Sequence, residues 1–273
     1  MAAEDDASAA YLGATGPAEG VAELAATPGP GSPITKVFVV GATGQTGRRV
    51  VQELRANGFQ VRAGVRDVRK AQGLGFALDP SGVELVTCDV VKQTAEQLAA
   101  AIGDAQAVIC CTGYTGFNPA GFGQVDEKGT INLVNAAKRT GVKRMVLLSS
   151  LLTNAPAVGQ ADNPNYKFLN IFGGVLDHKL VGEKYLRASG LTWTVVRPGG
   201  LSNEPAGTVG NLVVAPEDTL FGLENDPGRA ISRDTVAQVL VAALQQGAAA
   251  DKVLEIVASP TAPELPRDKW FAV

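Results

Sequence analysis

The chain has 273 residues, of which 45% are apolar, 19% are charged and 5% are aromatic. A formal charge of −3 argues against a nucleic-acid-binding protein, because phosphate binding needs clustered Lys and Arg. Three cysteines and one histidine exclude a disulfide framework and a His-rich metal site, so we expect no metal. No apolar run approaches the ~20 residues of a membrane-spanning helix, so we expect no membrane span.

The first 35 residues differ in composition from the rest. They contain no Lys or Arg, five acidic residues, and the loop-like string TPGPGSP at residues 27–33. We predict a disordered acidic tail over residues 1–35, and without its charge the remainder is close to neutral. The tail resembles neither a secretory signal nor an Arg- and Ser-rich transit peptide, so we expect any targeting peptide to be missing from this chain.

From residue 36 onward, short β-branched segments alternate with helical ones. Strands are predicted at residues 36–40, 59–65, 83–88, 105–111, 144–149 and 191–197, and the clearest helices at residues 48–56, 129–139 and about 166–188. This alternation implies parallel pairing through right-handed crossovers, hence an α/β fold with a doubly wound parallel sheet of the Rossmann type. We predict a single domain over residues 36–273.

After residue 197 the pattern becomes less regular. We predict a short strand at residues 211–214, a helix at residues 233–244 capped by Ser232, and a strand at residues 253–257. These pieces are too few for an independent domain. We expect a small C-terminal lobe from about residue 198, at the edge of the sheet.

The strongest motif is a glycine-rich turn that directly follows the first strand and begins a helix. Gly41 permits a tight turn, Gly44 lets the backbone approach a diphosphate, and Gly47 lets the helix pack closely on the sheet. The start of the helix offers free N–H groups to the phosphates. This context predicts a dinucleotide site. Its binding residues are Gly41, Thr43, Gly44, Gln45, Thr46 and Gly47.

The end of the second strand bears on the choice of dinucleotide. Arg66 stands where a basic residue would accommodate the 2′-phosphate of NADP, and a guanidinium matches phosphate through its forked donors. Asp67 is the alternative, because a shift of one residue would place an acid on the ribose of NAD. We favour NADP(H) over NAD(H). Further cofactor contacts are expected at the ends of the third and fourth strands, from Asp89, Val90, Thr112 and Gly113.

Several motifs together resemble the atypical short-chain dehydrogenases/reductases over about residues 36–258. They are the 41–47 turn, VRD at 65–67, CDV at 88–90, LSS at 148–150 and VRPGGL at 196–201. The segment NPNY at 163–166 and its continuation are similar to plant and algal chloroplast NAD(P)-binding proteins, which are related to the NADPH-binding part of a chloroplast inner-envelope translocon component. The resemblance implies an NAD(P)-binding oxidoreductase fold and a chloroplast location.

The family also suggests catalytic residues. Short-chain dehydrogenases use a Ser, a Tyr and a Lys, with the Tyr four residues before the Lys, which binds the nicotinamide ribose. The resemblance assigns that Lys to Lys179 and the serine to Ser149 or Ser150, whereas Val175 occupies the position of the Tyr and cannot transfer a proton. It also places the turn containing Pro198 and Gly199 beside the nicotinamide.

Other residues could supply the missing proton, but none stands out. Tyr166 is too far from Lys179 along a helix, and Tyr185 is expected to face elsewhere. Tyr114 lies in the loop after the fourth strand and could reach the site, but it too is a weak alternative. His178 adjoins Lys179, so on a helix the two side chains diverge, and we expect His178 to face solvent or to pack. The cysteines are interpreted as inert core residues.

Residues 166–176 form an unusually apolar segment, YKFLNIFGGVL. We expect a helix buried on several sides. The alternative is an exposed surface for an apolar substrate, a lipid body or membrane surface, or a partner protein.

The sequence therefore predicts an NADP(H)-binding protein, with two open alternatives for its activity. One is a reductase of a small or apolar acceptor that lacks the usual catalytic tyrosine, with hydride chemistry supplied by the nicotinamide. The other is a non-catalytic NADP(H) sensor or scaffold that binds a partner protein. A third, an RNA-binding relative of this fold, is disfavoured by the absence of a Lys/Arg run.

Overall fold

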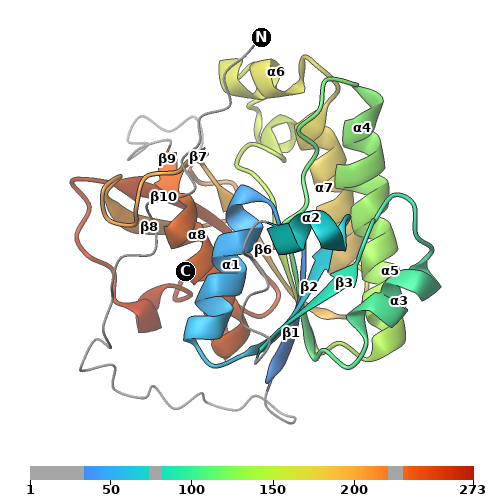
Figure 1. Cartoon of the computed structure of the whole chain (residues 1–273). Coiled ribbons are helices and arrows are strands. Elements are labelled where there is room, and N and C mark those ends of the chain that lie inside the picture. Colours follow the sequence, from blue (N-terminus) through green and yellow to red (C-terminus); the bar gives the residue numbers. More distant parts are fainter. Residues whose placement is uncertain (1–33, 74–81, 221–229) are drawn as a thin grey trace.

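The computed structural model describes residues 34–73, 82–220 and 230–273 (Figure 1). The predicted acidic tail lies outside these residues, apart from its last two positions. An eight-stranded sheet forms the centre, in the order β3-β2-β1-β4-β5-β6-β10-β8. Its strands are β1 (Lys36–Val40), β2 (Gln60–Val65), β3 (Val83–Thr87), β4 (Ala107–Cys110), β5 (Arg144–Leu148), β6 (Thr192–Pro198), β8 (Asn211–Pro216) and β10 (Lys252–Ser259).

The sheet is parallel except at one edge, where β8 runs antiparallel to β10. The strand order reverses direction at β1, which pairs with β2 on one side and β4 on the other. Ligands in open α/β sheets collect outside the carboxyl ends of the strands at such a switch point. The predicted Rossmann-type α/β fold is confirmed.

Helices cover both faces of the sheet, as Figure 1 shows. On one face α1 (Gln45–Ala56) lies beside α8 (Arg233–Gln245), and on the other lie α3 (Ala95–Ile102), α5 (Thr130–Thr140) and α7 (Val175–Arg187). The side chains of β1 alternate between these layers: Val37 and Val39 join the core under α1 and α8, while Phe38 joins the opposite core. Because both faces are covered, the central strands are apolar on both sides.

The shorter elements complete the chain. They are α2 (Val68–Gly73), α4 (Ala120–Phe122), the π-helix η1 (Gly123–Gly129), η2 (Ala155–Val158), α6 (Pro164–Asn170), β7 (Gly200–Ser202), β9 (Ala230–Ser232), η3 (Gly247–Ala249) and η4 (Arg267–Lys269). Strands β7 and β9 form a separate two-stranded sheet, whereas β8 and β10 extend the main one. Ser232 caps α8 as predicted, and its side chain accepts a hydrogen bond of 3.1 Å from the Asp234 N–H.

The single helix predicted at about 166–188 is wrong, because the structure divides it into α6 and α7. Gly173 and Gly174, with φ of 139° and 67°, lie between the two helices and adopt conformations that favour glycine. The prediction that this apolar segment is buried is also wrong. Phe168 and Phe172 are 69% and 70% exposed, and α6 contains no buried residue.

No helix in the described ranges has both the length and the apolar character needed to cross a membrane.

Candidate functional site

The glycine turn after β1 has the geometry that a dinucleotide needs. Gly41 has a φ of +75°, and a Cβ there would lie 2.9 Å from the Cys111 carbonyl oxygen. A Cβ on Gly47 would lie 2.1 Å from the Gly41 carbonyl oxygen, so only glycine fits. Gly44 precedes α1, and no side chain caps the helix. The result is a turn shaped by glycines in front of a twelve-residue helix whose first N–H groups are not capped by a side chain, which fits a diphosphate.

The other predicted cofactor residues also follow strands at this edge of the sheet. Arg66 follows β2, Asp89 and Val90 follow β3, Thr112 and Gly113 follow β4, and Pro198 and Gly199 end or follow β6. The structure brings some of them close together, because the built Cβ of Gly41 would lie 3.1 Å from the Thr112 nitrogen. Others have their groups engaged elsewhere: the backbone of Pro198 and Gly199 bonds to Leu151 and Ile256.

Arg66 and Asp67 have different roles in the structure. The Asp67 carboxylate accepts a hydrogen bond of 3.0 Å from the Lys70 N–H and so stabilises the start of α2. Arg66 is exposed, and within the described residues it has no ion-pair partner. Arg66, rather than Asp67, is therefore free to meet a ligand.

The loop after β3 is held by its own side chain. The Asp89 carboxylate accepts hydrogen bonds from the Val91 and Lys92 N–H groups, at 3.0 and 3.2 Å. Val90 is buried, and a Cβ on Gly129 would lie 2.6 Å from it. Asp89 therefore fixes the backbone of this loop, and Val90 packs beneath it against Gly129.

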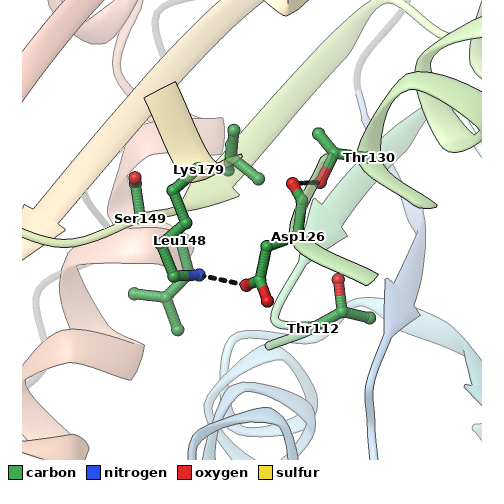
Figure 2. A pocket seen from close by; sticks show the side chains of 7 residues that line it. Thr112, Asp126, Thr130, Leu148, Ser149 and Lys179 are labelled. Carbon is green, nitrogen blue, oxygen red and sulfur yellow. Dashed lines mark hydrogen bonds and ion pairs between the residues drawn. The ribbon is translucent and has the colours of Figure 1, made fainter. Parts of the chain in front are cut away.

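A pocket with an empty volume of about 190 Å³, part of it open to solvent, lies next to the glycine turn (Figure 2). It is lined by Thr112, Asp126, Thr130, Leu147, Leu148, Ser149 and Lys179. Both predicted catalytic residues, Lys179 and Ser149, therefore face the same space, together with the predicted cofactor residue Thr112. The structure also places Gly113 beside the pocket, because its built Cβ would be 3.7 Å from the Lys179 Nζ.

Asp126 is a pocket residue that sequence reasoning missed. It lies in the π-helix η1, its side chain is fully buried, and its Oδ1 is 2.8 Å from the Lys179 Nζ. Its Oδ2 accepts a hydrogen bond of 3.1 Å from the Tyr114 N–H. The only sequence signal was an acidic residue just before the predicted helix at 129–139, and such acids are common near helix starts.

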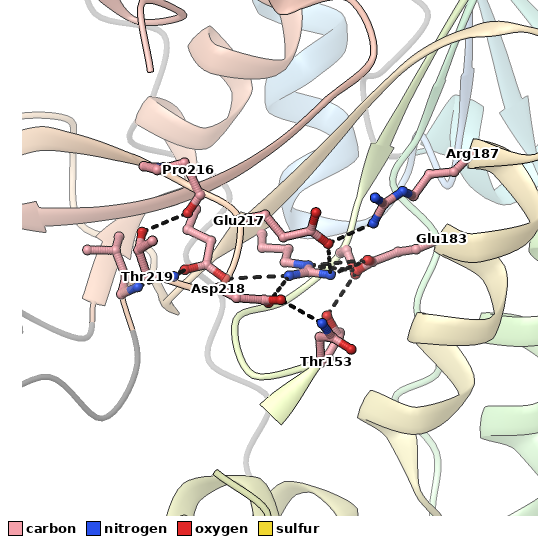
Figure 3. A network of polar contacts seen from close by, with 12 residues as sticks. Thr153, Glu183, Arg187, Pro216, Glu217, Asp218 and Thr219 are labelled. Atoms are coloured by element: carbon pink, nitrogen blue, oxygen red, sulfur yellow. Dashed lines mark hydrogen bonds and ion pairs between the residues drawn. The ribbon is translucent and has the colours of Figure 1, made fainter. Parts of the chain in front are cut away.

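Ser149 connects the pocket to a buried polar network through Glu183. Figure 3 shows this network around Glu183, Thr153 and Asp218. The Ser149 hydroxyl donates a short hydrogen bond to Oε1 of Glu183, which also accepts 3.1 Å from the Thr153 hydroxyl. Glu183 lies on α7 one turn after Lys179, so this helix carries one group of the pocket and one of the network.

Arg197 holds this network together instead of facing a ligand. Its fully buried guanidinium contacts Glu183 at 2.7 Å, Asp218 at 2.7 Å and Glu217 at 3.3 Å. Burial alone would lower the pKa of Arg197, but these acids raise it above its usual value. Glu255 lies 3.5 Å away, is also fully buried, and has a pKa raised chiefly by burial. The VRPGGL motif is therefore partly structural, because its arginine is enclosed.

None of the tyrosines in the described part of the chain lines the pocket. The Tyr166 hydroxyl donates to Asp177 at 2.6 Å, and burial and this carboxylate raise its pKa to about 12. The Tyr185 hydroxyl donates to Asn135 at 2.8 Å, and the Tyr114 hydroxyl accepts from the Asn118 N–H at 3.2 Å. Val175 begins α7 where the family has its tyrosine.

The turn, the switch point and the adjoining pocket define a dinucleotide-binding α/β protein of the oxidoreductase-like type. A sequence profile described as NAD(P)H-binding matches residues 41–247. The chain belongs to this NAD(P)H-binding family, and its resemblance to the atypical short-chain dehydrogenases/reductases is confirmed.

Individual relatives agree with this assignment. The chain is 50% identical over 239 residues to an uncharacterized chloroplastic protein of Arabidopsis thaliana, covering 87% of this chain and 81% of that protein. It is 36% identical to Protein TIC 62, chloroplastic, of Pisum sativum, covering 85% of this chain but only 45% of TIC 62. It is also 32% identical to sanguinarine reductase of Eschscholzia californica, covering 82% of this chain and 89% of that enzyme.

The fold itself recurs in solved structures. The oxidoreductase YlbE of Lactococcus lactis superposes with a TM-score of 0.70 at 22% identity, covering 87% of this chain and 95% of YlbE. This likeness concerns the fold.

Proposed function

We propose that this protein is an NADP(H)-dependent reductase that transfers a hydride to a small or apolar acceptor without a catalytic tyrosine. One observation carries the proposal. The pocket that contains Lys179, Asp126 and Ser149 adjoins the glycine turn, because Thr112 both lines the pocket and lies against Gly41. The predicted diphosphate-binding turn and the polar pocket are therefore adjacent, as hydride transfer from a bound dinucleotide requires.

The chain's own residues would hold the cofactor at one edge of the sheet. The Gly41–Gly47 turn and the start of α1 would bind the diphosphate, and Lys179 is the family's candidate for the nicotinamide ribose. The nicotinamide supplies the hydride when it is bound. The relationship to a plant reductase favours reduction.

Arg66 would select NADP(H) by pairing with the 2′-phosphate. This role is supported by its exposure and by the engagement of Asp67 at the start of α2. Arg66→Ala should weaken NADPH binding about 10- to 100-fold, the value of a charge-assisted bond to phosphate, and leave NADH binding nearly unchanged. Titration calorimetry with both reduced coenzymes measures this.

The matched control for Arg66 is Arg69→Ala, which removes another exposed arginine from the neighbouring helix α2. It should affect both coenzymes little. Equal weakening of NADPH and NADH by Arg66→Ala would contradict the 2′-phosphate role.

The reductase activity is tested by stopped-flow oxidation of bound NADPH with quinones, aldehydes and enones. Turnover with at least one acceptor supports the proposal. Tight NADPH binding without turnover by any acceptor would favour the second function, a non-catalytic NADP(H) sensor that binds a partner protein. The exposed apolar side chains of Phe168, Ile171 and Phe172 favour that alternative, because such patches mark interaction sites.

We further propose a chloroplast location, which the names of the plant relatives support. Because the chain spans less than half of TIC 62, any shared role with that protein concerns the NAD(P)-binding part alone.

A further inference from the structure

The pocket contains few protons that a substrate could take. The Ser149 hydroxyl proton is directed to Glu183, and the Thr130 hydroxyl donates 2.9 Å to the Asp126 backbone oxygen. The Thr112 hydroxyl is engaged with the Cys110 sulfur at 3.2 Å. Lys179 differs from these groups. Its ammonium carries three N–H donors, and its ion-pair partner within the described residues is Asp126 alone.

Lys179 is held at the pocket wall by a partner that is itself fixed. Both residues line the pocket, and the Asp126 side chain is fully buried whereas the Lys179 side chain is 17% exposed. The Tyr114 N–H fixes the second carboxylate oxygen. Figure 2 shows the Lys179 nitrogen and the Asp126 carboxylate facing each other inside the pocket.

A second acid–base pair, Glu127 and His178, also joins η1 to α7. Each of its residues is next in sequence to a residue of the Asp126–Lys179 pair. Glu127 contacts the ring of His178 at 2.6 Å. Neither residue lines the pocket. The contact between η1 and α7 thus contains two acid–base pairs, and of these only the Asp126–Lys179 pair lines the pocket.

We infer that Lys179 is the proton donor of the reaction and that Asp126 is the positioning residue that holds its ammonium in the pocket. This inference rests on the proposed reductase function. In this proposal the Lys179–Asp126 pair takes the role of the family's tyrosine, and Lys179 acts directly on the substrate.

The step balances for a carbonyl acceptor. The carbonyl carbon gains a hydride from the reduced nicotinamide dinucleotide, and the C=O π pair moves to oxygen. A Lys179 N–H bond then breaks, its electron pair stays on Nζ, and the proton forms the O–H bond of the alcohol. Water that enters through the open side of the pocket returns a proton to the amine. An acceptor that is already a cation, with a C=N⁺ or aromatic N⁺ centre, becomes neutral on gaining the hydride and needs no proton.

This difference supplies the test. Hydride transfer from NADPH is measured to 4-nitrobenzaldehyde, which needs a proton, and to N-methylacridinium, which does not, after subtraction of the uncatalysed rate. The double variant Asp126→Asn/Lys179→Met is used because it leaves no unpaired buried charge. With both reactions measured at saturating NADPH, we expect aldehyde reduction to fall about 100-fold or more relative to acridinium reduction, since general acid catalysis contributes about 10²–10⁴ and a lost cofactor contact affects both acceptors alike. The control Glu127→Gln should leave both rates unchanged.

A second measurement needs no turnover and no cofactor. In protein labelled with ¹⁵N-lysine, the Lys179 ammonium should give a proton-detected signal protected from exchange with water. We identify this signal by its absence in the double variant. It should disappear in Asp126→Asn, which keeps an acceptor for the Tyr114 N–H, and persist in Glu127→Gln. A protected signal that survives in Asp126→Asn would overturn the positioning role.

The outcomes separate the inference from the function beneath it. If the wild type reduces both acceptors and the double variant reduces the aldehyde equally well, the proton-donor role is wrong and the reductase stands. An equal loss with both acceptors, together with weaker NADPH binding, would make Lys179 a cofactor ligand only. If the wild type binds NADPH and reduces neither acceptor, the proposed reductase fails and the proton-donor role with it, while the NMR signal still decides whether Asp126 holds Lys179.

Discussion

The turn between β1 and α1 is shaped by glycines within one short segment, whereas the pocket beside it is lined mostly by polar side chains from separate elements. The turn occupies consecutive residues, and its geometry depends on side chains being absent at Gly41 and Gly47. The pocket depends on charges that meet across the fold, such as Asp126 on η1 and Lys179 on α7. The shape of the turn is thus encoded locally, and the pocket is assembled by tertiary contact.

The largest effect that would test this contrast comes from adding a single methyl group to the turn. Gly47→Ala places a carbon 2.1 Å from the Gly41 carbonyl oxygen, so the turn must open and its N–H groups must lose their direction. We expect NADPH binding to weaken by about 100-fold or more, because diphosphate binding at a helix start depends on those groups. Titration calorimetry measures the change.

Gly247→Ala is the control for that substitution, since a Cβ there meets nothing within 4 Å. It should leave NADPH binding unchanged. Undiminished binding by Gly47→Ala would show that the turn is not the diphosphate site.

The next effect concerns the buried network behind the pocket. Arg197→Met leaves the fully buried Glu183 without its cation and should cost about 3–5 kcal/mol of unfolding free energy. Urea denaturation measures the loss. The matched change Arg139→Met breaks an exposed pair with Glu96 and should cost no more than about 1 kcal/mol. Similar costs for the two variants would mean that the network contributes no more than a surface pair.

The smallest effect is a pH dependence within the same network. Burial raises the pKa of Glu255, so the folded protein keeps that carboxyl protonated at pH values where the unfolded chain has released the proton. The stabilisation is complete below the ordinary carboxyl pKa and is lost as the pH rises through the raised value. Glu255→Gln should therefore gain stability relative to the wild type on going from pH 5 to pH 8, measured by urea denaturation.

In the same experiment, the stability of Glu96→Gln relative to the wild type should change with pH in the opposite direction. Hydrogen bonds, first from its own backbone and then from Thr94, lower the pKa of Glu96, so its contribution is lost as the pH falls. A stability difference between Glu255→Gln and the wild type that does not vary with pH would show that Glu255 is ionised in the fold.

The features of the fold that could be predicted from the sequence are those that depend on local or periodic patterns. The strands, the glycine turn and the Ser232 cap each depend on neighbours a few residues away, and the structure has them where the pattern predicted. Lys179 and Ser149 could be assigned only through family resemblance, and the structure places both at one pocket.

What escaped prediction depends on tertiary contact. Asp126 gave no distinctive signal because an acid near a helix start is ordinary, and its partner lies far along the chain. The exposure of Phe168 and Phe172 could not be predicted either, because an apolar helix looks the same in sequence whether or not a neighbour covers it.

The π-helical turn of η1 has one more implication. This turn presents consecutive acids, Asp126 and Glu127, to the consecutive bases His178 and Lys179 on α7. The ion pair that lines the pocket and the pair beside it therefore depend on the conformation of the same short stretch of backbone.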